Sequence, residues 1–398
     1  MKLKSISELK KIKNLKVWVR VDYNVDIKNG KVTNTERIER SLPTIKYLLK
    51  NGAAIILASH LGRPEGKKDP KYSLKPLLPY IKKFTRKKVY FIDDCIGVKV
   101  EKAINNLKAN EILLLENLRF YAEEEKGDMN FAKKLATGAD IYVNEAFSNC
   151  HRNHASMSVI TKFLPAYGGL NLLDEVSHLS QALEKIKKPA VAIIGGLKIS
   201  TKIKVIDNLI KKYDRILIGG ALANNFFVAK KYNVGQSVVE KDYVSVAVKL
   251  LKKFDAKLII PFDVLIADRL DTKAKVMAVD VKQLNQVKWP KFNIIDIGPK
   301  TVLFYSAIIK KSQTIIWNGP MGFFEVKKFS QGTYDIAKVV ATVSQGKPYG
   351  VVGGGETLIA LDDLKMYKFV DFVSTAGGAM LEFMEGKILP GLKPLIKK

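Results

Sequence analysis

Two glycines followed by two lysines form the clearest candidate phosphate site in this sequence. Gly195 and Gly196 end a short apolar run, 190–194, and Lys198 and Lys202 come next, one helical turn apart. The backbone N–H groups of a helix's first turn lack partners within the helix, and glycines let a ligand approach them closely. Such a turn suits phosphate. An ordinary turn with two solvated lysines is the alternative interpretation.

Polar and cationic side chains follow the apolar runs of the first half of the chain. Asp22 and Asn24 follow the first run, Arg37 lies just past Asn34 and Thr35, and later runs are followed by His60, Arg63, Arg119, His151, Arg152 and His154. Arginine binds phosphate and carboxylate through paired N–H donors. We expect a rigid pocket for a small anion that carries both groups, with Asp22 and Asn24 holding its hydroxyl group.

Glycine turns follow the apolar runs of the second half. They lie at 195–196, 219–220, 296–301 (DIGPKT), 318–322 (NGPMG), 353–357 (GGGET) and 376–378 (AGG). Repeated glycine turns before helices suit a nucleotide, because they offer backbone donors to phosphate beside apolar clefts for the base. The sequence contains no G-x-x-x-x-G-K-[ST] and no G-x-G-x-x-G after a first strand, which argues against a P-loop and weakens a dinucleotide interpretation.

Buried strands must position these residues. Runs of strand length lie at 17–21, 54–57, 89–92, 112–115 and 141–143, and again at 191–194, 216–218, 258–260, 294–295, 314–317, 350–352 and 369–373. Continuous rather than alternating apolarity predicts parallel sheets covered by helices on both faces. Ligands bind beyond the carboxyl ends of such strands, which is where the candidate residues stand.

The chain is too long for a single core. At 398 residues it predicts two α/β domains, each with a parallel sheet of about six strands. We place the boundary at 164–173, where PAYGGL interrupts the strand pattern before a helix expected at 174–186.

Composition and cysteine usage predict a globular cytoplasmic protein. Hydrophobic residues make up 47% and charged residues 27%, and no apolar run is long enough for a membrane span. Residues 1–16 are charged throughout and lack the apolar block of a signal peptide. Cys95 and Cys150 cannot make a disulfide framework, which favours a reducing compartment.

The formal net charge of +28 admits nucleic acid, a membrane surface or anionic substrates as partners. The lysines are spread along the chain, mostly as pairs, and no arginine-rich arm or basic run interleaved with aromatic residues occurs. We therefore favour a lysine-rich composition over nucleic-acid binding.

Metal and nucleophile chemistry have few candidates. His151 and His154 have the spacing of a zinc pair, but no further Cys/His cluster supports one. Cys150 stands beside His151, yet neighbours in sequence need not face each other. Glu356, at a glycine-rich helix start, could hold Mg²⁺ through a nucleotide or cap the helix, and we favour the metal role.

The order of the motifs resembles that of phosphoglycerate kinases over nearly the whole chain, from about Val17 to Gly391. The motifs are RVDYNV, TERI, SHLGRP, LLLENLRF, NEAF…HRNHAS, IIGGLKISTKI, DIGPKT, WNGPMGFFE, GGGET and FVSTAGGA…EGKILPG. The resemblance implies two Rossmann-like domains joined by a hinge. Residues 1–168 would form the phosphoglycerate-binding domain and residues 169–388 the nucleotide-binding domain, with 389–398 packing back on the first domain. It also implies a monomer, and Mg²⁺-dependent, reversible phosphoryl transfer from 1,3-bisphosphoglycerate to ADP.

Motif matching implies the site residues. The phosphoglycerate side falls on Asp22, Tyr23, Asn24, Arg37, His60, Leu61, Gly62, Arg63, Arg119 and Arg152. The nucleotide side falls on Gly195, Lys202, Gly219, Asn318, Pro320, Glu325, Gly353, Gly354, Gly355, Glu356 and Thr357, with Glu325 on the ribose and Glu356 as the metal ligand. The groups expected around the moving phosphoryl group are Arg37, Lys198, Lys202, Gly377 and Gly378. An acyl phosphate already has a carboxylate leaving group, so we assign no general base, and we expect positioning, charge stabilisation and domain closure to supply catalysis.

The chain departs from the family pattern at several positions near these sites. Asp26 replaces a proline, Leu197 a small residue, Glu356 an aspartate, and Ala221 and Ala376 glycines, while 148–150 (SNC) replaces smaller residues. An alanine at positive φ would be strained, so Ala376 either has ordinary dihedral angles or strains the phosphate loop. None of the changes removes a charged group, and we predict an active enzyme. The alternatives are an inactive relative that only binds nucleotide, and a nucleic-acid-binding protein.

Overall fold

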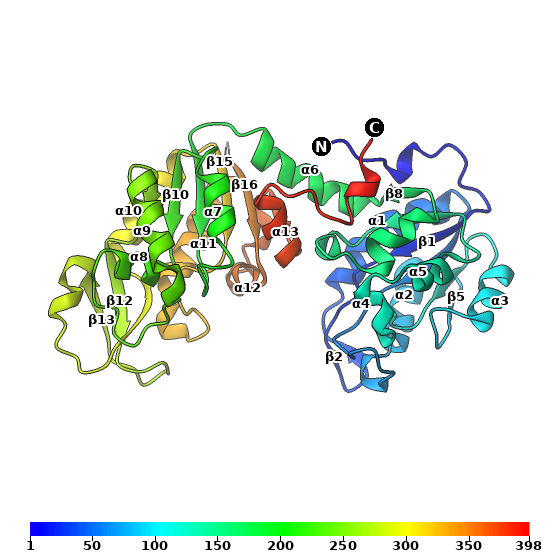
Figure 1. Cartoon of the computed structure of the whole chain (residues 1–398), viewed down its shortest axis with the longest axis horizontal. Helices are drawn as coiled ribbons and strands as arrows, with labels where there is room; N and C mark the ends of the chain where they lie inside the picture. The colour runs from blue at the N-terminus through cyan, green and yellow to red at the C-terminus, as the bar shows by residue number, and fades with distance from the viewer. Residues whose placement is uncertain (347, 398) are drawn as a thin grey trace. The chain divides into compact units, whose positions relative to one another are not determined.

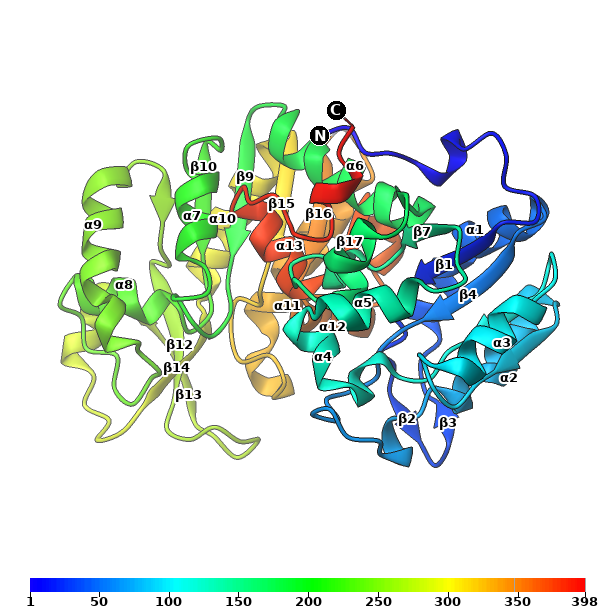
Figure 2. The ribbon, with the colours of Figure 1, turned by 45° about the vertical axis from the view of Figure 1, so that its right-hand side comes forward.

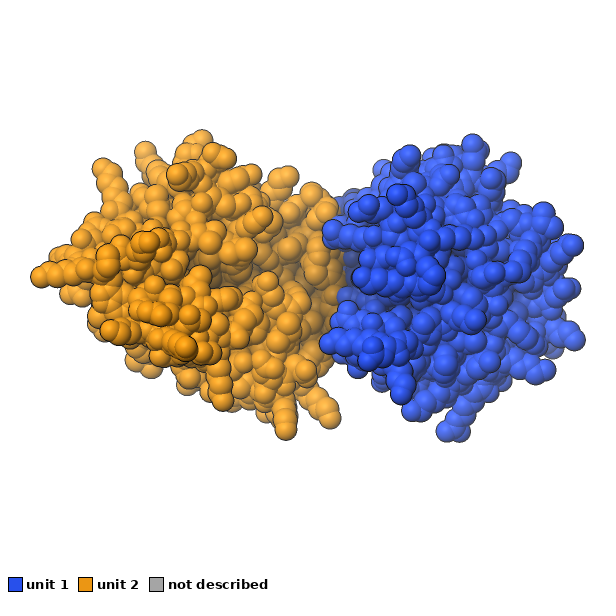
Figure 3. Space-filling view, turned by 90° about the horizontal axis from the view of Figure 1, so that it is seen from below, with its two compact units in different colours: residues 1–177, 388–398 blue, residues 178–387 orange. Residues whose placement is uncertain are grey.

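The computed structural model describes residues 1–346 and 348–397 and divides into two compact units. Unit 1 comprises residues 1–177 and 388–398, and unit 2 comprises residues 178–387 (Figure 3). The division falls within helix α6 (Leu170–Glu184), rather than at the boundary predicted after residue 168. This helix begins before the expected residue 174.

Unit 1 is built on a six-stranded parallel sheet of order β5-β6-β4-β1-β7-β8. Its strands are β1 (Lys16–Arg20), β4 (Ala54–Ala58), β5 (Val89–Phe91), β6 (Ile112–Leu114), β7 (Ile141–Asn144) and β8 (Ala166–Gly168). Every residue of β4 is buried, as its unbroken apolar sequence predicts. The helices around this sheet are α1 (Glu36–Lys50), α2 (Leu78–Thr85), α3 (Val98–Asn106), α4 (Ala122–Lys126) and α5 (Met129–Ala136) (Figure 1). A two-stranded hairpin, β2 (Ile27–Lys28) and β3 (Lys31–Val32), completes the unit.

Unit 2 repeats this plan with a parallel sheet of order β11-β10-β9-β15-β16-β17. Its strands are β9 (Ala190–Ile194), β10 (Arg215–Ile218), β11 (Leu258–Ile259), β15 (Thr314–Asn318), β16 (Tyr349–Gly353) and β17 (Phe372–Ser374). Its helices are α7 (Ile203–Leu209), α8 (Ala223–Ala229), α9 (Val244–Phe254), α10 (Pro299–Lys311), α11 (Gln331–Ser344), α12 (Gly355–Asp363) and α13 (Gly377–Met384). The predicted pair of parallel six-stranded sheets in an α/β fold is confirmed.

One predicted strand belongs to a different sheet. The run at 294–295 lies in β14 (Asn293–Ile297), which pairs antiparallel with β12 (Asp263–Ala267), and β12 pairs in turn with β13 (Val276–Asp280). Figure 2 shows these three strands together, beneath the parallel strands β9 and β10. The DIGPKT turn therefore does not stand at the edge of the parallel sheet, which corrects the expectation of six glycine turns along one edge.

The segment PAYGGL, predicted to interrupt the strand pattern, contains the sixth strand of unit 1. Strand β8 pairs with β7 in parallel register, from Tyr142 opposite Ala166 onward. The chain's last segment also belongs to this unit. The Gly391 N–H donates to the carbonyl of Cys150 at 2.8 Å, and the Asn144 side chain donates to the carbonyl of Gly391 at 3.1 Å. Lys398, included in the segment predicted to pack back, lies outside the described residues.

Each unit has its own apolar core. The core of unit 1 is formed by alternate residues of the sheet, such as Val17, Val19 and Ile55, together with the inner face of α1. In unit 2 Trp317 and Tyr305 are fully buried, and the Tyr305 hydroxyl donates to the carbonyl of Ile218 at 2.8 Å. Across the two described stretches of the chain, no helix is both long and apolar enough to cross a membrane.

Candidate active site

The sheet order of unit 1 brings its candidate anion-binding residues to one edge. They follow β6, β4, β1 and β7, which are four neighbouring strands of the sheet. The carboxyl ends of parallel strands meet at the same edge, so residues far apart in sequence converge there. The positive charges of Arg20, Arg119 and Arg37 all lower the pKa of His60, as expected for a cluster of cations around one point.

A network of hydrogen bonds holds several of these residues in place. Arg37 pairs with the carboxylate of Asp22, which also accepts a hydrogen bond from the Ser148 hydroxyl. The side-chain oxygen of Asn24 accepts from the Gly62 N–H at 2.8 Å. Arg119, 5% exposed, donates to the carbonyl of Gly62 at 2.8 Å, with its Nε 3.1 Å from a Glu125 carboxylate oxygen. These contacts tie together the loops that follow four different strands, β1, β4, β6 and β7.

Arg20, which sequence reasoning missed, fixes the orientation of His60. Arg20 is 1% exposed at the end of β1, its Nε donates to Ser156 Oγ at 2.9 Å, and its Nη2 lies 3.2 Å from His60 Nδ1. Arginine only donates, so Nδ1 accepts and Nε2 carries the ring proton. Burial, reinforced by Arg20, holds the pKa of His60 well below its usual range, so the ring is neutral. The signal was a charged residue inside the apolar strand VWVR.

Two residues predicted on the phosphoglycerate side have side chains that point into the core, and a third is a glycine. Tyr23 is fully buried in the core, with its hydroxyl 2.8 Å from Ser41 Oγ, and Leu61 is 5% exposed. Gly62 has φ +61°, and a Cβ there would come within 2.4 Å of the Tyr72 ring. The side chains of Tyr23 and Leu61 therefore pack in the core, and contact of these residues with substrate stays a prediction for their backbone groups. Arg63 is exposed and Arg152 half-buried.

In unit 2 the glycine turns after β9, β15, β16 and β17 surround one open pocket. These strands are neighbours in the sheet. The pocket has a volume of about 410 Å³ and is lined by Gly196, Leu197, Lys198, Thr201, Lys202, Asn318, Gly319, Gly354, Gly355, Glu356, Thr357, Gly377, Gly378 and Leu381. Helices α12 and α13 begin here, so their N-terminal N–H groups and two lysines are available to an anion.

Lys202 is the more deeply placed of the two lysines. It is 8% exposed at the start of α7 and donates to the side-chain oxygen of Asn318. Burial lowers its pKa to about 8, while the charge of Glu356 acts in the opposite direction. A buried lysine with a lowered pKa beside an open pocket is typical of a functional site.

Three predicted nucleotide-binding glycines instead allow the walls of the site to pack. A Cβ at Gly195 would lie 2.1 Å from the Pro320 carbonyl oxygen. At Gly219 and Gly353 it would lie 2.5 Å from Met321 Sδ and 2.0 Å from Met380 Sδ. None of these three glycines lines either cavity, and each leaves no room for a side chain; their direct contact with nucleotide stays a prediction.

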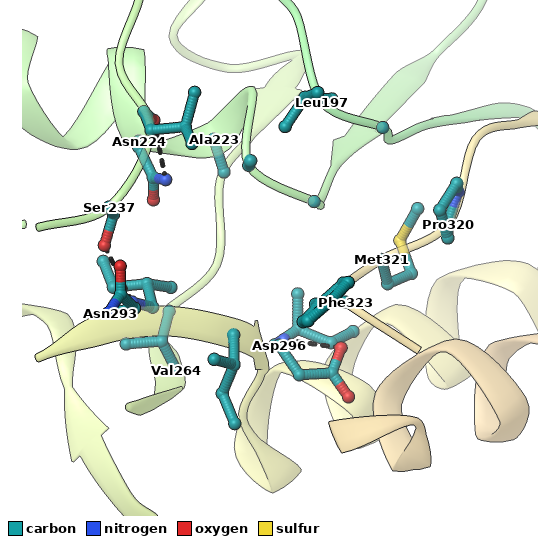
Figure 4. Close-up of a pocket in the computed structure, with 18 of the residues that line it drawn as sticks. Leu197, Ala223, Asn224, Ser237, Val264, Asn293, Asp296, Pro320, Met321 and Phe323 are labelled. Carbon is teal, nitrogen blue, oxygen red and sulfur yellow. Dashed lines mark hydrogen bonds between the residues drawn. The ribbon is translucent and has the colours of Figure 1, made fainter. Parts of the chain in front are cut away.

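A second cavity of about 280 Å³ adjoins the first and shares Gly196, Leu197 and Glu356 with it. Pro320 and Glu325, both predicted on the nucleotide side, line it together with Ala223, Phe227, Val238, Val264, Met321 and Phe323 (Figure 4). Asp296 also faces it and accepts backbone hydrogen bonds from Gly332 at 2.6 Å and Ile297 at 2.9 Å; burial raises the pKa of this carboxyl to about 8. An apolar cavity beside a lysine-lined pocket matches a nucleotide with its base in the first and its phosphates in the second.

Two alanines that replace family glycines cause no backbone strain. Ala376 caps α13 with φ −84° and ψ 2°, and Ala221 is absent from the positive-φ residues of the described chain. Positive φ falls on the next position, where Gly377 has φ +42°. In the turn at 376–378, glycine therefore stands at the position that has positive φ.

No group of three or more His, Cys, Asp or Glu side chains that could hold a metal occurs among residues 1–346 and 348–397. His151 and His154 therefore belong to no such group, and Cys150 is buried with its thiol pKa raised to about 12 by burial. Glu356, exposed in the first turn of α12, is the one carboxylate lining the lysine pocket in this described part of the chain. One carboxylate plus phosphate oxygens is a common Mg²⁺ site, so these residues fit a magnesium–nucleotide complex.

A cluster of cations on one α/β unit, together with an apolar cavity beside a lysine-lined pocket on the other, is typical of a phosphotransferase of the kinase class. Comparison with known proteins makes the assignment specific. The sequence model described as "Phosphoglycerate kinase" matches residues 6–387. Curated phosphoglycerate kinases from Leptospira biflexa and from Wolbachia of Culex pipiens are 44% and 45% identical, covering 100% and 96% of this chain and 99% and 96% of their own lengths.

Solved structures agree with this result. The phosphoglycerate kinase of Coxiella burnetii matches with a TM-score of 0.88 at 38% identity, over 99% of both chains. That of Pyrococcus horikoshii matches with a TM-score of 0.83 at 30% identity, over 99% of this chain and 98% of its own. The chain belongs to the phosphoglycerate kinase family. It is accordingly a phosphotransferase with a carboxyl group as acceptor, acting in glycolysis.

Proposed function

We propose that unit 1 binds the phosphoglycerate, that unit 2 binds the nucleotide, and that Mg²⁺-dependent transfer runs reversibly from 1,3-bisphosphoglycerate to ADP. The observation that carries this assignment is the convergence of cations at four neighbouring strand ends of unit 1. Arg37, Arg119 and Arg152 suit the carboxyl and phosphate groups of a phosphoglycerate. Asp22 and Asn24 suit its hydroxyl group.

Catalysis rests on positioning and charge stabilisation, without a general base. The transferring phosphoryl group spreads negative charge over its oxygens, and Arg37, Lys198, Lys202 and the backbone N–H groups of Gly377 and Gly378 supply donors to it. Burial lowers the pKa of His154 to about 3, so this ring is neutral at pH 7 and its 3.8 Å approach to Glu124 is not an ion pair. A neutral His154 ring can help to orient the substrate by hydrogen bonding. It need not supply a proton, because the leaving group of the acyl phosphate is already a carboxylate.

Glu356 would hold Mg²⁺ together with the nucleotide's phosphates, and the ion would supply charge neutralisation. The acyl phosphate and the diphosphate react only when brought together, so the cycle includes closure of the two units, which also keeps water from hydrolysing the acyl phosphate. We place the enzyme in the cytoplasm as a monomer, with small-molecule substrates as its partners and without nucleic acid.

Calorimetric titration of two variants tests whether unit 1 binds the phosphoglycerate and unit 2 binds the nucleotide. The charge of Arg152 acts on both Arg119 and His154, which supports a place for it in the anion pocket. Arg152→Ala should weaken 3-phosphoglycerate binding by about 10- to 100-fold, because a charged hydrogen bond is lost, and leave the Kd for ADP unchanged. The control Lys83→Ala removes the same charge from exposed α2 and should change neither Kd. Equal losses for both ligands with Arg152→Ala would contradict the proposal.

The pKa of Lys202 predicts how nucleotide binding depends on pH. Below about pH 8 this lysine is charged, and above it the proton is lost, so ADP affinity should fall as pH rises from 7.5 to 9.5, by less than the loss of kcat expected when the Lys202 charge is removed. Arginine stays protonated in this range, so Lys202→Arg should remove the fall. Binding of 3-phosphoglycerate serves as the reference, since His60 and His154 are already neutral there. An ADP affinity that stays constant across the range would refute this assignment for Lys202.

A further inference from the structure

The side chain of Asn224 presents an unused hydrogen-bond acceptor to the apolar cavity of unit 2. Asn224 lies on α8, is fully buried, and lines the cavity. Its Nδ2 donates to the carbonyl of Val238 at 3.0 Å. Its Oδ1 is buried and has no hydrogen-bond partner within the described chain. Figure 4 shows the amide on the cavity wall, with its oxygen directed toward Ser237.

The surrounding groups fix which end of the amide faces the cavity. The carbonyl of Val238 needs a donor, so the nitrogen must occupy that position and the oxygen the other. Ser237 cannot satisfy the oxygen, because its hydroxyl donates to the carbonyl of Val234 and accepts from the Ile294 N–H at 2.7 Å. A buried amide oxygen without a partner carries a desolvation cost that a donor on a bound ligand would remove.

The shape of the cavity restricts that ligand. Its walls are mostly apolar side chains, and it opens through Gly196, Leu197 and Glu356 to the pocket that holds Lys198 and Lys202. A nucleotide with its phosphates at the lysines places its base in the cavity. In a purine base the substituent at position 6 lies on the edge away from the ribose, so this substituent enters deepest.

We propose that Asn224 sets the nucleobase preference by accepting a hydrogen bond from the exocyclic amine of adenine. The proposal rests on nucleotide binding by unit 2, as proposed above. Adenine carries an N–H donor at position 6, whereas hypoxanthine and guanine carry a carbonyl oxygen there. Two acceptors would then face each other in a mostly apolar cavity, and the Asn224 amide cannot turn around without losing its bond to Val238.

Three diphosphates that differ at position 6 test this on the unmodified protein. ADP presents an amine, purine riboside 5′-diphosphate presents hydrogen, and IDP presents a carbonyl. Calorimetry with Mg²⁺ should give the tightest Kd for ADP, with IDP weaker by about tenfold or more and the purine riboside compound between them. Equal Kd values for ADP and IDP would overturn the proposal. If none of the three binds, nucleotide binding by unit 2 fails as well.

Two neighbouring asparagines provide a matched pair of variants. Asn225 is equally buried, but its amide is fully paired, donating to the carbonyl of Glu240 at 2.7 Å and accepting from its N–H at 3.3 Å. Asn224→Leu should reduce the ADP:IDP affinity ratio to about twofold or less. Asn225→Leu should lower the Tm but keep the parental ratio. If Asn224→Leu keeps the ratio, or Asn225→Leu lowers it equally, the Asn224 oxygen does not set the preference. If Asn224→Leu does not fold, the series of three diphosphates still decides.

Discussion

Replacing Lys202 with alanine is expected to lower kcat by about 100- to 1,000-fold while changing the KM for ADP far less. Lys202 is nearly buried, contacts Asn318, and lines the pocket where α12 and α13 begin. Its charge should stabilise the phosphoryl group most strongly in the transition state, when that group is between donor and acceptor. Initial rates at saturating concentrations of both substrates measure the effect.

The control for this variant is Lys204→Ala, which removes an exposed lysine from the same helix. It should leave kcat and KM at parental values, because its side chain does not line the pocket. A loss in Lys202→Ala confined to the KM for ADP would show that Lys202 only binds the ground state. It would contradict the role given to this residue.

Replacing Arg37 with alanine is expected to lower kcat by about 100-fold, through the same kind of charge stabilisation from unit 1. Arg37 lies in the first turn of α1, is 35% exposed, and is held by Asp22, so its guanidinium has a fixed position with donors left for a ligand. The KM for the acyl phosphate should change less than kcat, as expected for an interaction made mainly in the transition state.

Arg40 provides the matched control, since it lies on the same helix and has the same charge. Its guanidinium donates to Glu36 at 2.9 Å and lies 3.9 Å from Glu175. Arg40→Ala should therefore keep the parental kcat. If both arginine variants lose activity to the same degree, the loss reflects the net charge of the unit and not a specific contact of Arg37.

Strands buried on both faces were predictable because their apolar runs are unbroken, as in β4 and β9. The antiparallel sheet was not predictable from the sequence. Its strand β13 has exposed residues such as Met277, and a mixture of exposed and buried residues also occurs in loops. Strand β8 has only three residues, one of them Gly168. It is a strand because β7 offers an unpaired edge, which is tertiary information that the segment does not contain.

The predicted site residues divide according to what their side chains can reach. Charged residues after strands, such as Arg119 and Lys202, lie at the sites because parallel sheets gather strand ends. Tyr23 and Leu61 stand between such residues, but alternation along the backbone turns their side chains into the core. Arg20 and Asn224 were missed because burial and hydrogen-bond satisfaction depend on partners distant in sequence. Their roles follow only from contacts with His60 and Val238.

A coupled assay with Mg²⁺ tests the central claim most directly. It measures whether the candidate sites of units 1 and 2 together form ATP from ADP and 1,3-bisphosphoglycerate. The parent should turn over, and Glu356→Asp and Ala376→Gly should stay active beside it, because Ala376 has ordinary dihedral angles and either carboxylate can hold the ion. A folded parent protein that bound ADP yet formed no ATP would contradict the account. This holds whether or not the two variants are active.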